Sequence, residues 1–187
     1  MPKITEEIPY NGAIEKVTRL GLTTLLEEVR GIATGFELLV KEETDSNGGA
    51  AVRKLIDAQF ERATGWTKKQ SGDVDWTKCK IINGTRVCMG VEVQVSARSD
   101  LLVIDIHHLR RAIISGQIDI GVLLVPNDEL SVFLTDRGPS ISDAKRHVAG
   151  ARAEDLPLIL MAFKHDGSGP ALKKQAKRRS KRPRRTS

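Results

Sequence analysis

The sequence predicts an α/β protein in which a mixed central β-sheet contains a β-hairpin and is flanked by helices. Three observations lead to this prediction. Apolar residues recur at helical spacing in the first third of the chain, Asn83-Gly84 is a tight-turn signal inside a β-rich stretch, and residues 118–125 are a continuous apolar run. A hairpin, a crossover helix and a buried strand in succession build one α/β domain, which we place at residues 1–169.

The first half of the chain is predicted to contain two helices and the hairpin. Residues 13–30 and 50–64 carry apolar side chains three or four positions apart, and a turn-rich break at residues 45–49 lies between them. The spacing of the apolar residues then changes from the helical period to the one typical of a strand. Residues 74–95 are therefore predicted to form two strands that fold back on each other at Asn83-Gly84.

The second half is predicted to alternate between helices and strands. Ser99 is a suitable N-cap for a helix over residues 100–115, which Gly116 ends. The remaining elements are, in order, a buried strand, a second strand, a helix and a last strand, over residues 118–125, 130–134, 142–149 and 156–163.

The positive charge of the chain is concentrated at its C-terminal end. The net charge is +6, but residues 170–187 contain nine basic residues and no acid, which leaves 21 basic against 24 acidic residues and a net charge of −3 elsewhere. Such a run cannot bury apolar surface and predicts a disordered tail. We interpret it as a clamp for nucleic-acid phosphates, with a solubilising extension as the alternative. Its basic residues are Lys173, Lys174, Lys177, Arg178, Arg179, Lys181, Arg182, Arg184 and Arg185.

The sequence predicts neither a membrane protein nor a secreted one. No stretch approaches the roughly 20 apolar residues that span a bilayer, and residues 1–7 lack the pattern of a signal peptide. We therefore expect a cytoplasmic protein in which Cys79 and Cys88, although neighbours across the hairpin, are reduced. Two cysteines and four scattered histidines do not form a zinc site, and we expect His107 and His108 on the surface of their helix.

The predicted hairpin brings two carboxylates together. If Asn83 and Gly84 are the central residues of a type I′ turn, the numbers of facing residues sum to 167. Asp75 then faces Glu92 in a non-hydrogen-bonded pair, with Cα atoms about 4.5 Å apart, on the open face of the strand. Opposed like charges destabilise a hairpin unless a cation lies between them, and Mg²⁺ prefers such oxygen ligands.

Alternatives to this metal site remain open on the residues alone. Asp75 and Glu92 are also compatible with ordinary solvent-facing strand residues, and a bulge between them would break the register. Asp73 has the same parity as Asp75 and is a rival ligand. Asp57 and Glu61 share one face of the preceding helix, and either is a candidate to join the site, with surface residues as the simpler interpretation.

The residues around the hairpin also follow a family pattern. The chain has Val74-Asp75-Trp76-Thr77-Lys78, the hairpin, and then Gly90-Val91-Glu92-Val93-Gln94-Val95. This arrangement resembles the PD-(D/E)xK nucleases, in which an Asp, a hairpin, an Asp or Glu, any residue and a Lys follow in order. It is most similar to BglII-type restriction endonucleases, in which Gln replaces that Lys. Supporting segments are Gly65-Trp66, Gln117-Ile118-Asp119-Ile120-Gly121-Val122 and Val125-Pro126.

The resemblance covers residues 65–129, about a third of the chain, and departs from the family in two places. The stretch between Asp75 and Glu92 is longer than in that branch, and no aromatic residue follows Gln94. What the resemblance implies is a restriction-endonuclease-like fold and Mg²⁺-dependent hydrolysis of a phosphodiester. Asp75, Glu92 and the Val93 carbonyl would hold the metal, and Gln94 would orient the attacking water, because an amide does not titrate.

The predicted ligand is double-stranded DNA, cut by a homodimer whose two sites match a palindrome. Ser96, Arg98 and Ser99 leave the catalytic strand towards a helix N-terminus, where phosphate contacts are favoured. Arg98 has two other interpretations, as a reader of guanine and as a solvated loop residue. The rival functions are a DNA-binding protein that does not cut, and a nuclease acting on RNA or in repair.

Overall fold

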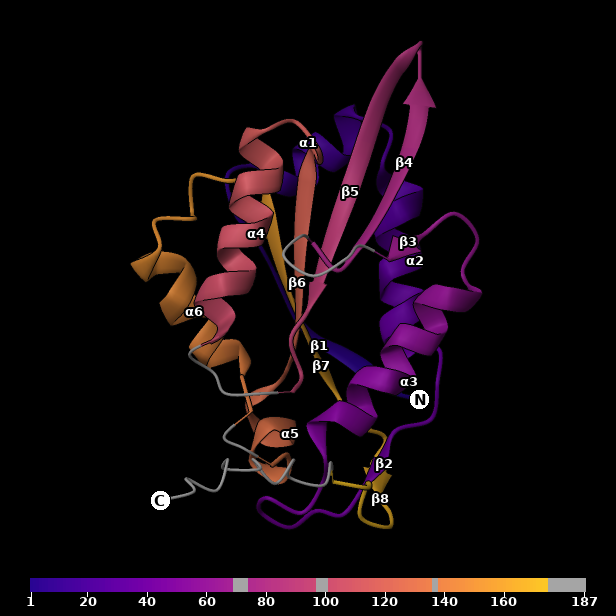
Figure 1. Ribbon diagram of the computed structural model, residues 1–187, viewed down its shortest axis with the longest axis vertical. Coiled ribbons are helices and arrows are strands. Elements are labelled where there is room, and N and C mark those ends of the chain that lie inside the picture. The colour runs from indigo at the N-terminus through magenta and orange to yellow at the C-terminus, as the bar shows by residue number, and fades with distance from the viewer. Residues whose placement is uncertain (69–73, 97–100, 136–137, 175–187) are drawn as a thin grey trace, which may run out of the picture.

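The chain folds around a six-stranded mixed β-sheet (Figure 1). The computed structural model describes residues 1–68, 74–96, 101–135 and 138–174. The strands of this sheet are β1 (Lys3–Pro9), β3 (Thr67–Lys68), β4 (Trp76–Ile82), β5 (Thr85–Val93), β6 (Ile120–Pro126) and β7 (Leu158–Lys164). Their order is β1-β7-β6-β5-β4-β3. Strands β5, β6 and β7 are parallel to one another, and β1, β4 and β3 complete the two edges as antiparallel neighbours. The predicted α/β class with a mixed central sheet is confirmed.

Helices cover both faces of the sheet (Figure 1). One face packs against α1 (Ala13–Arg19), α2 (Thr23–Thr34) and α3 (Gly49–Arg62), and the other against α4 (Leu102–Ile114) and α6 (Ile141–Gly150). Alternation within β6 follows this division, because Val122 and Leu124 lie in the first core and Leu123 and Val125 in the second. No helix in the described part of the chain has both the length and the apolar content that crossing a membrane requires.

The predicted hairpin is confirmed residue by residue. Asn83 and Gly84 have φ angles of 50° and 78°, as a type I′ turn requires. The pairing runs in the expected register from Ile82 opposite Thr85 to Trp76 opposite Val91. Within it, Cys79 and Cys88 form a disulfide, with Cα atoms 4.0 Å apart, in place of the two reduced thiols expected from the sequence.

Three local predictions were wrong or incomplete. The single helix over residues 13–30 is two helices, separated at Gly21, which adopts a φ of 66°. Residues 130–134 do not form a strand; α5 (Asp128–Phe133) lies there, with the Asn127 side chain accepting a hydrogen bond from the Leu130 backbone N–H at 2.9 Å. Strand β1 was not predicted, nor was the small parallel sheet of β2 (Leu39–Val40) and β8 (Gly167–Ser168).

The start of the basic tail is attached to the domain. The Leu172 backbone N–H donates to Asn47 Oδ1 at 3.1 Å, and its carbonyl accepts from the Gly48 N–H at 3.1 Å. Lys173 and Lys174, both exposed, line a groove of about 620 Å³ beside the first turn of α3, together with Lys54. The other basic residues of the tail lie outside the described residues.

Candidate metal centre

Two carboxyl groups meet at the end of the hairpin, as its register requires. Asp75 directly precedes β4 and is the residue opposite Glu92 of β5 when the observed pairing is extended by one position. The two side chains are hydrogen bonded to each other. Asp75 Oδ2 also accepts a hydrogen bond from the Val93 backbone N–H at 3.0 Å, which fixes the carboxylate at the last residue of β5. Asp73, the rival to Asp75, lies outside the described residues.

Glu92 does not lie on an open face, and this corrects the sequence analysis. Its side chain points to the α4 side of the sheet and the residue is only 2% exposed. Burial raises the pKa of the Glu92 carboxyl to about 11, with further contributions from the charge of Asp75, the hydrogen bond to it and the charge of Asp105, while Arg53 acts in the opposite direction. In the absence of a metal ion, Glu92 is therefore protonated at neutral pH.

Arg53 of α3 occupies the position beside Asp75 where a cation is needed. Its Nη2 lies 2.9 Å from Asp75 Oδ1, and its Nη1 donates to the Val93 carbonyl at 2.5 Å. Its Nε donates to Asp57 Oδ1 at 2.9 Å. The guanidinium thus contacts two of the three groups that the sequence analysis assigned to a metal, and only 20% of the side chain is exposed.

The acids of α3 do not join the carboxyl pair directly. Asp57 is the partner of Arg53 and also accepts hydrogen bonds from Lys68 Nζ at 2.9 Å and Trp76 Nε1 at 3.1 Å. Glu61 is exposed, 4.0 Å from Lys68 Nζ. Asp57 therefore positions Arg53, and Glu61 belongs to the surface.

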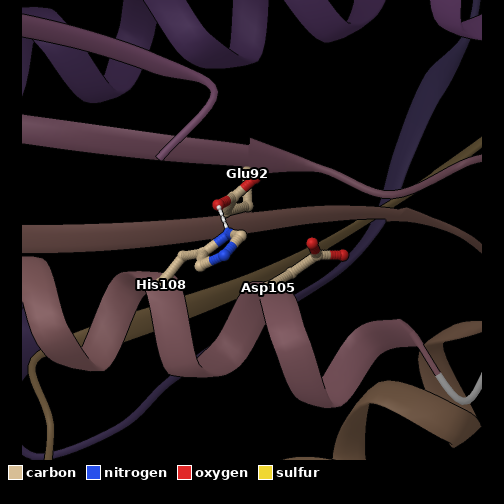
Figure 2. A group of neighbouring side chains, drawn as sticks. All are labelled: Glu92, Asp105 and His108. Atoms are coloured by element: carbon tan, nitrogen blue, oxygen red, sulfur yellow. Dashed lines mark hydrogen bonds and ion pairs between the residues drawn. The ribbon is translucent and has the colours of Figure 1, made fainter. Parts of the chain in front are cut away.

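Two residues of α4 lie close to the Glu92 side chain, on the face of the sheet to which it points (Figure 2). His108 Nδ1 lies 3.1 Å from Glu92 Oε1, and Asp105 lies one turn earlier on the helix. Each of the three side chains offers a metal-ligating atom, and these atoms all lie within 4.8 Å of one another. Burial, followed by the charge of Asp75, raises the pKa of Asp105 to about 7, and Arg53 lowers it.

Asp105 and His108 were not predicted as site residues from the sequence, and the prediction that His108 lies on the helix surface was wrong. The exposed residue of the histidine pair is His107. A signal was available, because Asp105 and His108 are three positions apart and adjoin the buried Leu102, Ile106 and Leu109 on α4. This spacing indicates a ligand pair only when α4 is known to pack over Glu92.

Two further predicted site residues, Gln94 and Ser96, follow the end of β5. Gln94 is 7% exposed, and its backbone N–H donates to the Leu124 carbonyl at 2.9 Å. Ser96 is half-buried, next to Gly49 at the start of α3. Arg98 and Ser99 lie outside the described residues, as do Arg178, Arg179, Lys181 and Arg182 of the tail.

We expect Glu92→Gln to stabilise the metal-free protein increasingly as pH rises. The folded protein keeps a proton on Glu92 up to a pKa of about 11, whereas the unfolded chain releases it near the ordinary value of 4.5. Stability from this group is therefore complete below the unfolded pKa and is lost as pH rises towards the folded pKa. Glutamine resembles the protonated acid and does not titrate, so the variant should escape this loss.

The measurement is the Tm of both proteins in a chelator at several pH values from about 5 to 9. Each kcal/mol gained corresponds to about 2–4 °C for a chain of this size. Glu61→Gln, at an exposed site, is the control and should not change the pH dependence. A constant difference between wild type and Glu92→Gln at all pH values would contradict the assignment.

We expect Arg53→Met to make the stability of the protein depend on divalent metal. The substitution keeps the aliphatic part of the side chain and removes the charge that faces Asp75 and Asp57, which should cost on the order of 3 kcal/mol without metal. Added Mg²⁺ should then raise the free energy of unfolding more in the variant than in the wild type.

Urea unfolding with and without Mg²⁺ measures both effects, and Lys54→Met, at the adjacent exposed position, is the control. Equal Mg²⁺-dependent stabilisation of Arg53→Met and wild type would show that Arg53 does not occupy a cation position.

Comparison with known proteins does not indicate a family for this chain. No protein-family model matches it, and no curated protein is significantly similar to it. A functional assignment therefore depends on the chemistry of the residues described above.

Proposed function

We propose that this protein is a Mg²⁺-dependent endonuclease that hydrolyses phosphodiester bonds of double-stranded DNA at specific sequences, related to the BglII-type restriction endonucleases. The observation that carries the proposal is the meeting of the Asp75 and Glu92 carboxyl groups beside the backbone of Val93, with Gln94 next along the chain. These are the residues and the order that the family resemblance requires. A restriction-endonuclease-like fold is part of the same proposal.

The residues present fit a hard divalent cation. The donors are carboxylate and carbonyl oxygens, the atoms that Mg²⁺ prefers, and once Glu92 is ionised the carboxylate pair needs more positive charge than Arg53 supplies. Asp75, Glu92 and the Val93 carbonyl are the proposed ligands. Glu92 must release its proton to serve as one, so metal binding and deprotonation of Glu92 are linked.

Each residue of the site has a separate task in this proposal. Asp75 is held by the Val93 N–H, so its carboxylate is positioned before a ligand arrives. Gln94 orients the attacking water by hydrogen bonding and takes no proton, because its amide does not titrate. A bound Mg²⁺ supplies Lewis acidity, which polarises the phosphate and lowers the pKa of water.

Contact with DNA is assigned to the basic residues near the site. Lys54, Lys173 and Lys174 line the groove beside the first turn of α3, and Gly49 in that turn lies against Val95 and Ser96 at the end of the catalytic strand. Ser96, Arg98, Ser99 and the basic residues of the tail are proposed to extend this surface. We further infer that a homodimer carries out double-strand cleavage and that the protein acts in the cytoplasm, where the Cys79–Cys88 disulfide is an exception to the reduced state of most thiols.

One observation favours a DNA-binding protein that does not cut. The guanidinium of Arg53 already contacts Asp75 and the Val93 carbonyl, so this part of the fold is electrostatically satisfied without a metal. The two functions differ in whether a metal ion replaces Arg53 as the partner of Asp75 and the Val93 carbonyl when DNA is bound. A nuclease for RNA or for repair intermediates differs from both in its substrate.

Cleavage of a long, unmethylated DNA of complex sequence in the presence of Mg²⁺ tests the proposal. Discrete fragments should appear, and Asp75→Asn or Glu92→Gln should reduce the rate by about 10³-fold, since each removes a metal ligand and with it several kcal/mol of transition-state stabilisation. Glu61→Gln should cut at the wild-type rate. A wild type that binds but never cuts would leave the non-catalytic alternative, and an active Glu92→Gln would refute the site.

Ending the chain after Lys174 tests the tail while keeping the hydrogen bonds of Leu172 with Asn47 and Gly48. This truncation removes seven basic residues. The slope of log K against log salt should decrease by up to about 0.9 for each phosphate that the shortened chain no longer neutralises, while Mg²⁺-dependent cleavage persists at low salt. An unchanged slope in filter-binding or fluorescence titrations would show that the tail does not bind DNA.

A further inference from the structure

We propose that Glu92, Asp105 and His108 form a second cation site, distinct from the Asp75 position, and that this site takes a first-row divalent transition metal. The proposal concerns binding of a metal to the free protein, and it holds or fails independently of DNA cleavage. Figure 2 shows the three side chains between β5 and α4.

The geometry of the cluster is close to that of a ligand set. A metal that binds its ligands at about 2.1 Å holds them roughly 3–4 Å apart. His108 Nδ1 and Glu92 Oε1 are already 3.1 Å apart, and one atom from each of the three residues lies within 4.8 Å of the others. Small side-chain rotations on a rigid strand and helix would complete the site.

The cluster contains a buried polar atom that no other described residue contacts through a hydrogen bond. Asp105 Oδ2 is buried and has no hydrogen-bond partner among the described residues. An unpaired buried carboxylate oxygen is costly, and a metal ion is one of the few partners that fully compensates it. Asp105 is held one turn from His108 by α4, so both residues face the same side of β5.

The chemistry of the donors selects the class of metal. Asp75 and the Val93 carbonyl offer only oxygen, whereas this cluster combines two carboxylates with an imidazole nitrogen. Imidazole binds Mn²⁺, Co²⁺ or Zn²⁺ in preference to Mg²⁺, and affinity rises from Mn²⁺ to Co²⁺ along the first row. Three protein ligands also leave positions open for water or a phosphate oxygen. Glu92 is common to both sites.

Metal titration of the full chain without DNA tests the proposal. Mn²⁺ binding is measured by calorimetry and Co²⁺ binding by its visible absorption, with Mg²⁺ titrated separately. The structure has no thiolate to compete within the described residues, because Cys79 and Cys88 are joined. His108→Gln should weaken Mn²⁺ and Co²⁺ binding at least about tenfold and leave Mg²⁺ binding unchanged. Asp105→Asn should act in the same direction.

His107→Gln is the matched control, since this exposed histidine is the neighbour of His108 on α4. It should bind Mn²⁺ and Co²⁺ as the wild type does, and thermal melts of all variants establish that they fold. Unchanged Co²⁺ affinity in His108→Gln overturns the proposal. Equal loss of Mg²⁺ and Mn²⁺ in His108→Gln also overturns it, because a single shared site would then explain both metals. Neither result bears on whether Asp75→Asn abolishes DNA cleavage.

Discussion

The burial of the Glu92 carboxyl is the constraint on which the whole site depends. An ionised carboxylate with 2% exposure needs a positive partner or a proton, because the protein interior solvates charge poorly. The neighbouring acids Asp75 and Asp105 increase this requirement, and Arg53 reduces it. Metal-free protein satisfies the constraint by protonation, at a pKa of about 11. A divalent cation would satisfy it with the carboxylate ionised, so the proposed metal binding is linked to loss of the Glu92 proton.

The sheet determines why these groups meet. Glu92 is the residue beside Leu123 in the parallel pairing of β5 with β6, and the connection between those strands is the helix α4. A crossover helix must pack on a face of the sheet, and α4 packs on the face to which Glu92 points. Arg53 reaches the end of β5 from α3, which belongs to the other face. The site therefore lies at the carboxyl end of a strand, between layers, where α/β proteins commonly bind ligands.

Much of this arrangement follows from local patterns, and each wrong or missing prediction has its own physical cause. The hairpin register was predictable because a two-residue turn with left-handed Asn83 and Gly84 fixes every later pair. The segment at residues 130–134 looks like a strand by its apolar content, but the Asn127 cap and the first-turn acids direct it into α5. The strand β1 was missed because its alternation is weak, and its pairing partner β7 is more than 150 residues away along the chain. Asp105 and His108 were missed because a helix face has no visible partner in the sequence.

The sequence by itself determined the α/β class, the hairpin and the opposition of Asp75 and Glu92, because each follows from contacts between residues near one another along the chain. Only the tertiary structure decided that Glu92 is enclosed, that Arg53 neutralises Asp75, and that His108 reaches the carboxyl pair. Those outcomes depend on how α3 and α4 pack against β5. Helix packing is set by the complementarity of whole surfaces, and no spacing within a single segment encodes it.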